Sequence, residues 1–130
     1  MSKADVERVI TGYWDALRSG EFETALGYYA DDLVFHYYGH NPIAGDYVGK
    51  AACLEVLRKI GARTNRKVLD ILEMGFQEER GTVIARESFE RDGQVAVVDR
   101  TFIYRIAGEK IAEVWILDKD QQTVDRFLAD

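Results

Sequence analysis

The sequence predicts an α+β domain in which helices come first and a long antiparallel sheet follows. Three observations indicate this fold class. Apolar residues return at intervals of three and four over much of the first half of the chain, which is the spacing of amphipathic helices. Strand-like segments succeed one another after residue 66. Short turns join these segments, so neighbouring strands are expected to pair antiparallel.

The first half of the chain predicts three helices and one strand. Residues 3–18 place their apolar side chains on one helical face, and the Ser-Gly pair that follows ends the pattern. A shorter helix is expected over residues 22–30. The segment LVFHYY, residues 33–38, is rich in β-branched and aromatic residues and predicts a strand. Helical spacing then returns over residues 50–62.

The second half predicts a meander, so the whole order is helix, helix, strand, helix and four strands. The four segments are residues 67–77, 81–91, 95–106 and 110–118. Turn residues divide them: Glu79 to Gly81, Asp92-Gly93, and Gly108 to Lys110. The final residues, QQTVDRFLAD, are compatible with a last helical turn. Because the strands mix polar with apolar residues, we expect a curved sheet with a hollow beneath the helices.

The composition fits one cytoplasmic domain that spans residues 1–130. A chain of 130 residues can bury a core without disulfides, and Cys53, the sole cysteine, is expected to be a small core residue. The net charge of −6 argues against nucleic-acid partners. Arg63, Arg66 and Lys67 form the nearest approach to a basic patch and are interpreted as a solvated turn. No segment has the apolar length of a signal peptide or a membrane span.

The stretch HYYGHNPIAGDYVG, from His36 to Gly49, holds both histidines and the only proline. Its glycines and its proline exclude regular structure from most of it, and we expect it to form the mouth of a pocket. His36 and His40 stand four residues apart, but no third ligand accompanies them, so no metal is expected. Because no phosphate-cradling loop is present, no nucleotide, flavin or other cofactor is expected.

The order of elements, with YADD before the first strand and NPIAGDYVG after it, resembles the SnoaL-like group of the nuclear transport factor 2 superfamily. The resemblance extends from Val6 to Asp118. It implies a cone in which a strongly curved, mostly antiparallel sheet wraps around the N-terminal helices and encloses a pocket. It also implies a homodimer formed through the outer face of the sheet. Members include ketosteroid isomerases, polyketide cyclases, epoxide hydrolases and binding proteins, so the fold leaves the function open.

The segment TGYWDALRSGEFETALGYYADD carries the resemblance to the ketosteroid isomerases. It places Tyr13 where those enzymes keep the tyrosine that hydrogen-bonds the developing enolate oxygen. Their general base falls at His36 or Tyr37, depending on a one-residue gap. Their second acid falls at Thr101, and Asp99 lies two residues earlier on the same strand face.

The resemblance to two other enzyme groups is less complete. The cyclases have an acid directly after the tryptophan of the last strand, where this chain has Ile116. The epoxide hydrolases use an arginine, an aspartate separated from it by one intervening residue, and an aspartate on the last strand. Arg86 keeps the arginine, whereas Ser88 and Ile116 replace the two aspartates. The expected ligand-contacting residues are Trp14, Tyr37, Arg86, Thr101 and Ile116.

Two classes of function fit these residues. The first is acid–base chemistry, such as isomerisation or cyclisation, on a small apolar substrate with an oxygen atom. Tyr13 would bind the oxygen, and His36 or Asp99 would move the proton. A poorly solvated Asp99 should have a raised pKa, and the alternative is a salt bridge with Arg86. Tyr13 has the alternative role of a core residue, and His36 that of a partner for a backbone carbonyl.

The second class is a non-catalytic domain that holds a small apolar ligand or a protein partner, and a third is a structural dimer with a filled interior. The cavity distinguishes them, because catalysis requires Tyr13, His36 and Asp99 to converge in it. A homodimer is expected in each case. We expect the outer face of the sheet to carry Arg100, Phe102, Tyr104 and Trp115, which would expose apolar surface unless a second copy covered it.

Overall fold

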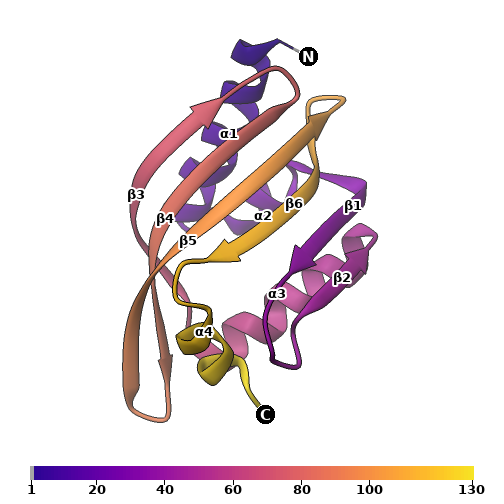
Figure 1. Cartoon of the computed structure of the whole chain (residues 1–130). Helices are drawn as coiled ribbons and strands as arrows, with labels where there is room; N and C mark the ends of the chain where they lie inside the picture. Colours follow the sequence, from indigo (N-terminus) through magenta and orange to yellow (C-terminus); the bar gives the residue numbers. More distant parts are fainter. Residues whose placement is uncertain (1) are drawn as a thin grey trace.

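The computed structural model describes residues 2–130 and confirms the α+β prediction (Figure 1). The helices are α1 (Lys3–Arg18), α2 (Phe22–Leu26), α3 (Lys50–Thr64) and α4 (Gln121–Leu128). The strands are β1 (Tyr29–Tyr37), β2 (Gly45–Val48), β3 (Lys67–Phe76), β4 (Arg80–Arg91), β5 (Gln94–Ala107) and β6 (Lys110–Asp118). No helix within the described residues has the length and apolar character needed to cross a membrane.

Local sequence explains where the two long helices begin and end. Ser2 caps α1, because its hydroxyl accepts a hydrogen bond from the Asp5 backbone N–H while the Asp5 carboxylate accepts one from the Ser2 backbone N–H. Helix α3 ends at Thr64, and its C-cap residue Asn65 adopts the left-handed conformation with φ of 44°. That turn directs the chain into β3.

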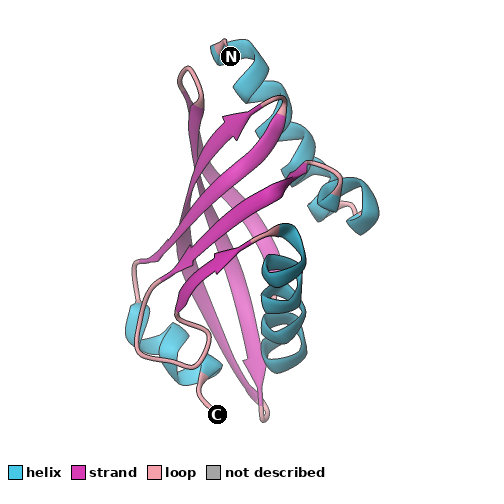
Figure 2. Cartoon of the chain, turned by 90° about the vertical axis from the view of Figure 1, so that its right-hand side faces the viewer, coloured by secondary structure: helices cyan, strands magenta, loops and turns pink. Residues whose placement is uncertain are grey.

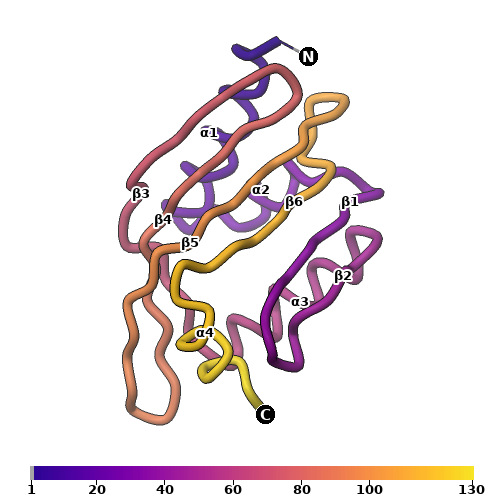
Figure 3. Tube along the Cα trace, in the orientation of Figure 1, coloured from indigo at the N-terminus to yellow at the C-terminus, as the bar shows by residue number. Residues whose placement is uncertain are grey.

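The strands form one sheet in the order β2-β1-β6-β5-β4-β3. Strands β3 to β6 form the predicted antiparallel meander, and β1 forms a hairpin with β2. Strand β1 also runs parallel to β6, which joins the N-terminal hairpin to the end of the meander (Figure 3). The turn predicted at Asp92-Gly93 is confirmed: φ is 52° and 78°, as in the two-residue turns that match strand twist.

Register shifts accompany the bending of the sheet. They occur between β1 and β6, between β3 and β4, and between β5 and β6. Such irregularities increase local twist and bend a strand. The sheet curves without closing, and α1 and α3 lie against one of its faces (Figure 2). We call this the inner face and the opposite one the outer face.

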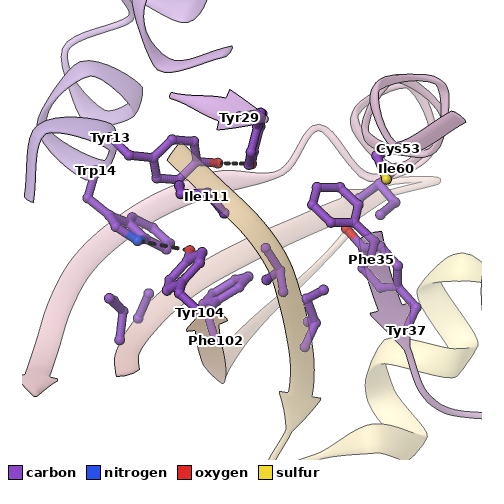
Figure 4. Packing of buried hydrophobic residues seen from close by; sticks show 14 of the residues in the cluster. Tyr13, Trp14, Tyr29, Phe35, Tyr37, Cys53, Ile60, Phe102, Tyr104 and Ile111 are labelled. Carbon is purple, nitrogen blue, oxygen red and sulfur yellow. Dashed lines mark hydrogen bonds between the residues drawn. The ribbon is translucent and has the colours of Figure 1, made fainter. Parts of the chain in front are cut away.

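Strand β5 shows how strictly the two faces alternate. Its buried residues are Val98, Arg100, Phe102, Tyr104 and Ile106. Phe102 and Tyr104 pack near Trp14 of α1, whose indole Nε1 donates a hydrogen bond to the Tyr104 hydroxyl (Figure 4). The prediction that placed Arg100, Phe102 and Tyr104 on the outer face is therefore wrong.

The alternation of side chains along each strand explains this error. Trp115, which does lie on the outer face, pairs with Ile103, so odd-numbered residues of β5 share its face and even-numbered ones point inward. A shift of one residue moves every side chain of a strand to the other face. The sequence pattern gave the alternation correctly but not the direction in which each strand faces.

Three element boundaries differ from the predictions. Helix α2 ends at Leu26, because β1 already begins at Tyr29 and pairs there with β6. The stretch expected to be irregular contains β2, which follows a turn built on Asn41. The side-chain oxygen of Asn41 accepts hydrogen bonds from the backbone N–H groups of Ile43 and Ala44. The C-terminal residues form the eight-residue helix α4 rather than one turn.

Candidate ligand-binding site

A cavity of about 610 Å³ lies between the helices and the start of β3. Side chains of α1, α2, α3 and the first residues of β3 form its walls. Most of them are apolar: Leu17, Phe22, Ala25, Leu26, Leu54, Leu57 and Val68. The polar side chains of the lining are Tyr13, Arg18, Arg58, Arg66 and Lys67. This size and this mixture of walls are typical of sites for small organic molecules.

Tyr13 is the residue of the cavity lining whose side chain carries a hydroxyl group. Its ring is buried, with 5% of its surface exposed. The Tyr29 hydroxyl donates a hydrogen bond of 2.6 Å to the Tyr13 hydroxyl (Figure 4). Burial raises the pKa of Tyr13, so the group stays protonated at neutral pH. Since its oxygen accepts from Tyr29, Tyr13 keeps its own proton for another acceptor.

Arg66 is the most buried cation of the lining, with 17% of its side chain exposed. Its Nε and Nη2 atoms each donate a hydrogen bond of 2.5 Å to the carboxylate of Glu87. The remaining nitrogen, Nη1, makes no hydrogen bond within residues 2–130, where no buried side-chain nitrogen or oxygen lacks a partner. Nη1 is therefore a donor without a protein partner among these residues, on a side chain that lines the cavity.

A line of buried charges on the inner face holds Arg66 in place. Glu87 of β4 also faces Arg100 of β5, with 3.4 Å between Oε1 and Nη1. Arg100 in turn donates to Asp118 at the end of β6, through Nε at 2.6 Å and Nη2 at 3.2 Å. Burial by itself would raise the pKa of Glu87, but the guanidinium groups of Arg66 and Arg100 outweigh it and lower that pKa. Glu87 thus stays ionised and orients Arg66.

His36 lies on the outer face of the sheet, away from this cavity. It alternates along β1 with the buried side chains of Phe35 and Tyr37. Its Nε2 lies 2.6 Å from the carboxylate of Glu113, and its Nδ1 lies 2.6 Å from that of Asp46. Its ring stacks on Trp115 with 5.3 Å between centroids. The structure therefore does not bring His36 together with Tyr13.

Asp99 also lies on the outer face, where it forms the alternative salt bridge. Arg86 donates to its two carboxylate oxygens at 2.9 Å and 3.3 Å. That hydrogen bond lowers the pKa of Asp99, so of the two alternatives for this residue the structure shows the salt bridge and not the raised pKa. Thr101 follows on the same face of β5 and is likewise remote from Tyr13. The three residues proposed for acid–base chemistry thus do not converge.

The remaining predicted ligand contacts are part of the core. Trp14 is 1% exposed and lies edge-on to Tyr13 with 5.8 Å between ring centroids. Tyr37 packs on Phe35 and Tyr47 on the inner face, and Ile116 is buried on β6. None of these three contributes to the cavity lining. Of the predicted site residues, Tyr13 alone borders the cavity.

Sequence reasoning missed Arg66, Glu87 and Arg100. Arg66 was interpreted as part of a solvated turn, which is wrong because its guanidinium is held over the inner face by Glu87. The alternation of apolar residues along β4 did give a signal for Glu87. Glu87 stands between Ala85 and Phe89 at an inward-facing position of β4, and a charge in such a position needs a buried partner. Within residues 2–130 no group of three or more histidine, cysteine or acidic residues is arranged to hold a metal ion.

Residues 10–114 match the family of SnoaL-like domains. No curated protein is similar enough in sequence to count as a match. Among solved structures, an NTF2-like protein from Burkholderia xenovorans superposes with a TM-score of 0.80 at 21% identity, over 98% of this chain and 98% of its own.

Two further structures share the arrangement. TerC, co-crystallized with polyporic acid, has a TM-score of 0.80 at 15% identity, over 95% of this chain and 97% of its own. A putative polyketide cyclase from Xanthomonas campestris pv. campestris has a TM-score of 0.73 at 14% identity, over 98% of each chain. At these identities the likeness shows a common fold.

Proposed function

Because the chain belongs to the family of SnoaL-like domains, we propose that it binds a small, largely apolar molecule with an oxygen acceptor in the cavity beside Tyr13. One observation carries the proposal. Tyr13 lines a mainly apolar cavity, and because its hydroxyl accepts from Tyr29, its own proton is available to an acceptor on a ligand. The apolar walls would hold the body of the ligand, and Tyr13 with Arg66 would fix its oxygen. The co-crystallization of TerC with polyporic acid supports ligand binding by a fold of this kind.

Isomerase or cyclase chemistry is the second candidate, and Tyr13 is the residue that favours it. A neutral hydroxyl at the cavity wall can stabilise an oxyanion that develops during a reaction. Proton transfer would have to come from His36 or Asp99, which lie on the outer face. The described residues that line the cavity include no histidine, aspartate or glutamate. Binding is therefore the better-supported function.

Two probes of similar shape test the proposal. 2-Acetylnaphthalene carries a ketone oxygen, whereas 2-ethylnaphthalene carries none. Tyr13→Phe should weaken binding of the ketone by about 0.5–1.5 kcal/mol, because it removes one hydrogen bond, and should leave the hydrocarbon nearly unaffected. Isothermal titration calorimetry measures both affinities. An equal effect on the two probes would show that the hydroxyl does not face the ligand.

A cavity-filling variant locates the site. Leu57→Trp adds bulk to the cavity wall and should weaken both probes strongly. Leu72→Trp is the matched control, because Leu72 is 40% exposed on β3 and does not line the cavity. Unchanged affinities in a folded Leu57→Trp variant would place the ligand elsewhere and contradict the proposed function.

A further inference from the structure

All charged residues that line the cavity are cations. They are Arg18, Arg58, Arg66 and Lys67, and none of the described lining residues is acidic. The chain as a whole has 17 basic and 23 acidic residues and a net charge of −6. The lining therefore has the opposite sign to the protein. Such a local excess of one charge attracts ligands of the other charge.

The four cations differ in how far protein carboxylates neutralise them. Arg58 pairs with Glu55 at 2.6 Å on the exposed side of α3. Arg66 pairs with Glu87 but keeps Nη1 free. Arg18 and Lys67 are exposed and form no ion pair within residues 2–130. Two charges and one free guanidinium donor thus remain for a ligand.

These groups come from different elements around the cavity. Arg18 ends α1, Arg58 lies on α3, and Arg66 and Lys67 begin the path into β3. A ligand whose apolar body lies among the leucines would have cations beside it on several sides. The free N–H groups of Nη1 are suited to a carboxylate oxygen, because a charge-assisted hydrogen bond is stronger than a neutral one. Glu87 and its partners hold the Arg66 guanidinium in place before the ligand arrives.

We propose that the ligand of this cavity is an anion, with a ring-sized apolar body and one carboxylate group. The body lies against Leu54, Leu57 and the neighbouring apolar side chains, and the carboxylate accepts from Arg66 Nη1. Arg18 and Lys67 add attraction at the rim. Arg66 is thus a specificity-determining residue and Glu87 a positioning residue. This inference rests on the proposed function, because it concerns the same cavity.

2-Naphthoate and 2-naphthamide form the test pair, because they have nearly the same shape and differ in charge. Calorimetry at about 20 mM salt should show naphthoate binding about tenfold more tightly, and about 300 mM salt should reduce the difference. The double variant Arg18→Gln, Lys67→Gln should weaken naphthoate roughly three- to tenfold and naphthamide less than twofold. The control variant Lys3→Gln, Lys59→Gln changes the net charge by the same amount, but its two residues do not line the cavity. It should therefore have little effect on the affinity for naphthoate.

Arg66→Lys tests the inner contact while it keeps a positive charge opposite Glu87. A thermal melt establishes that the variant folds. The affinity for naphthoate should then fall more than the affinity for naphthamide. Lysine lacks the planar guanidinium whose several N–H groups can bond Glu87 and the ligand at the same time. Equal affinity of the two probes, with binding that Leu57→Trp still abolishes, would overturn the anion inference and leave the proposed function standing. An equal loss of naphthoate affinity in the control variant Lys3→Gln, Lys59→Gln would also overturn the anion inference. If the protein bound neither 2-naphthoate nor 2-naphthamide, and neither 2-acetylnaphthalene nor 2-ethylnaphthalene, the anion inference and the proposed function would both be overturned.

Discussion

His36 illustrates how its neighbours decide what one titratable residue does. Desolvation by itself would lower the pKa of His36, but its hydrogen bonds to Glu113 and Asp46 outweigh this and raise the pKa. The bond to His36 also lowers the pKa of Glu113. Because these three residues belong to β1, β2 and β6, the protonated imidazole links strands on both sides of β1. These contacts lie on the face of the sheet opposite the cavity.

The raised pKa of His36 predicts a pH dependence of stability. A group whose pKa is higher in the folded state stabilises the fold fully below its unfolded value of about 6.5, and this stabilisation is lost as the pH rises through the folded pKa. The free energy of unfolding should therefore fall as the pH rises above about 6.5 and through the raised pKa of His36. His36→Gln should remove most of that fall, as measured by urea unfolding at several pH values. The control variant His40→Gln should show the same fall in the free energy of unfolding as the unmodified protein. An unchanged fall in His36→Gln would contradict the prediction.

At the scale of elements, glycine has opposite effects in a turn and in a helix. Gly93 occupies the left-handed conformation, with φ of 78°, between β4 and β5. Gly61 lies inside α3, and a Cβ atom added there would meet nothing within 4 Å. The first position requires the freedom of glycine, whereas the second loses helix stability because of it.

Alanine substitutions should therefore change stability in opposite directions. Gly93→Ala should lower the free energy of unfolding by about 1–2 kcal/mol, because an L-residue is strained in this conformation. Gly61→Ala should raise it by about 0.5–1 kcal/mol, because alanine favours the helix. Chemical denaturation of both variants beside the unmodified protein measures this. Changes of the same sign would show that the local conformations are not the determining factor.

Many of the elements were predictable from sequence because their causes are local. Helical periodicity and turn residues such as Asp92-Gly93 act within a few residues, and they correctly predicted α1, α3 and the meander of β3 to β6. The direction in which a strand faces depends on its partners, which explains why Phe102 was assigned to the wrong face. The same holds for the site, since Arg66 and Glu87 are 21 residues apart and meet only after the sheet has formed. Tyr13, which borders the cavity, was singled out because the family resemblance marks it.

For the whole molecule, the outer face of the sheet is the proposed homodimer interface. Exposed apolar side chains lie on it: Val95 is 63% exposed, Val97 58% and Leu117 42%. Trp115 adds an aromatic ring, which stacks with His36 and has Arg80 5.0 Å from its centroid. A surface of this kind on a sheet is suited to pairing with a second copy. The dimer prediction therefore rests on these exposed residues and no longer on Phe102 and Tyr104, which are buried on the inner face.

Light scattering at micromolar concentration should give twice the monomer mass of 14.8 kDa. The double variant Val97→Glu, Leu117→Glu should shift the protein toward the monomer, because it places charges in the apolar interface. Val48→Glu is the control, since Val48 is 74% exposed on the edge strand β2. A monomer mass for the unmodified protein would show that the outer face is not a dimer interface.

The parallel pairing of β1 with β6 has a consequence for how the chain is completed during synthesis. Val34 pairs with Glu113, and Tyr37 pairs with Ile116, so the partner of β1 is made some eighty residues after β1 itself. Until then the N-terminal hairpin has one strand edge without its partner. Loops of this length close slowly, and contacts between such distant residues reduce the folding rate. The nascent chain therefore cannot finish its sheet until residues 110–118 have been made, so the last strand of the sheet to be made is the one that joins its two parts.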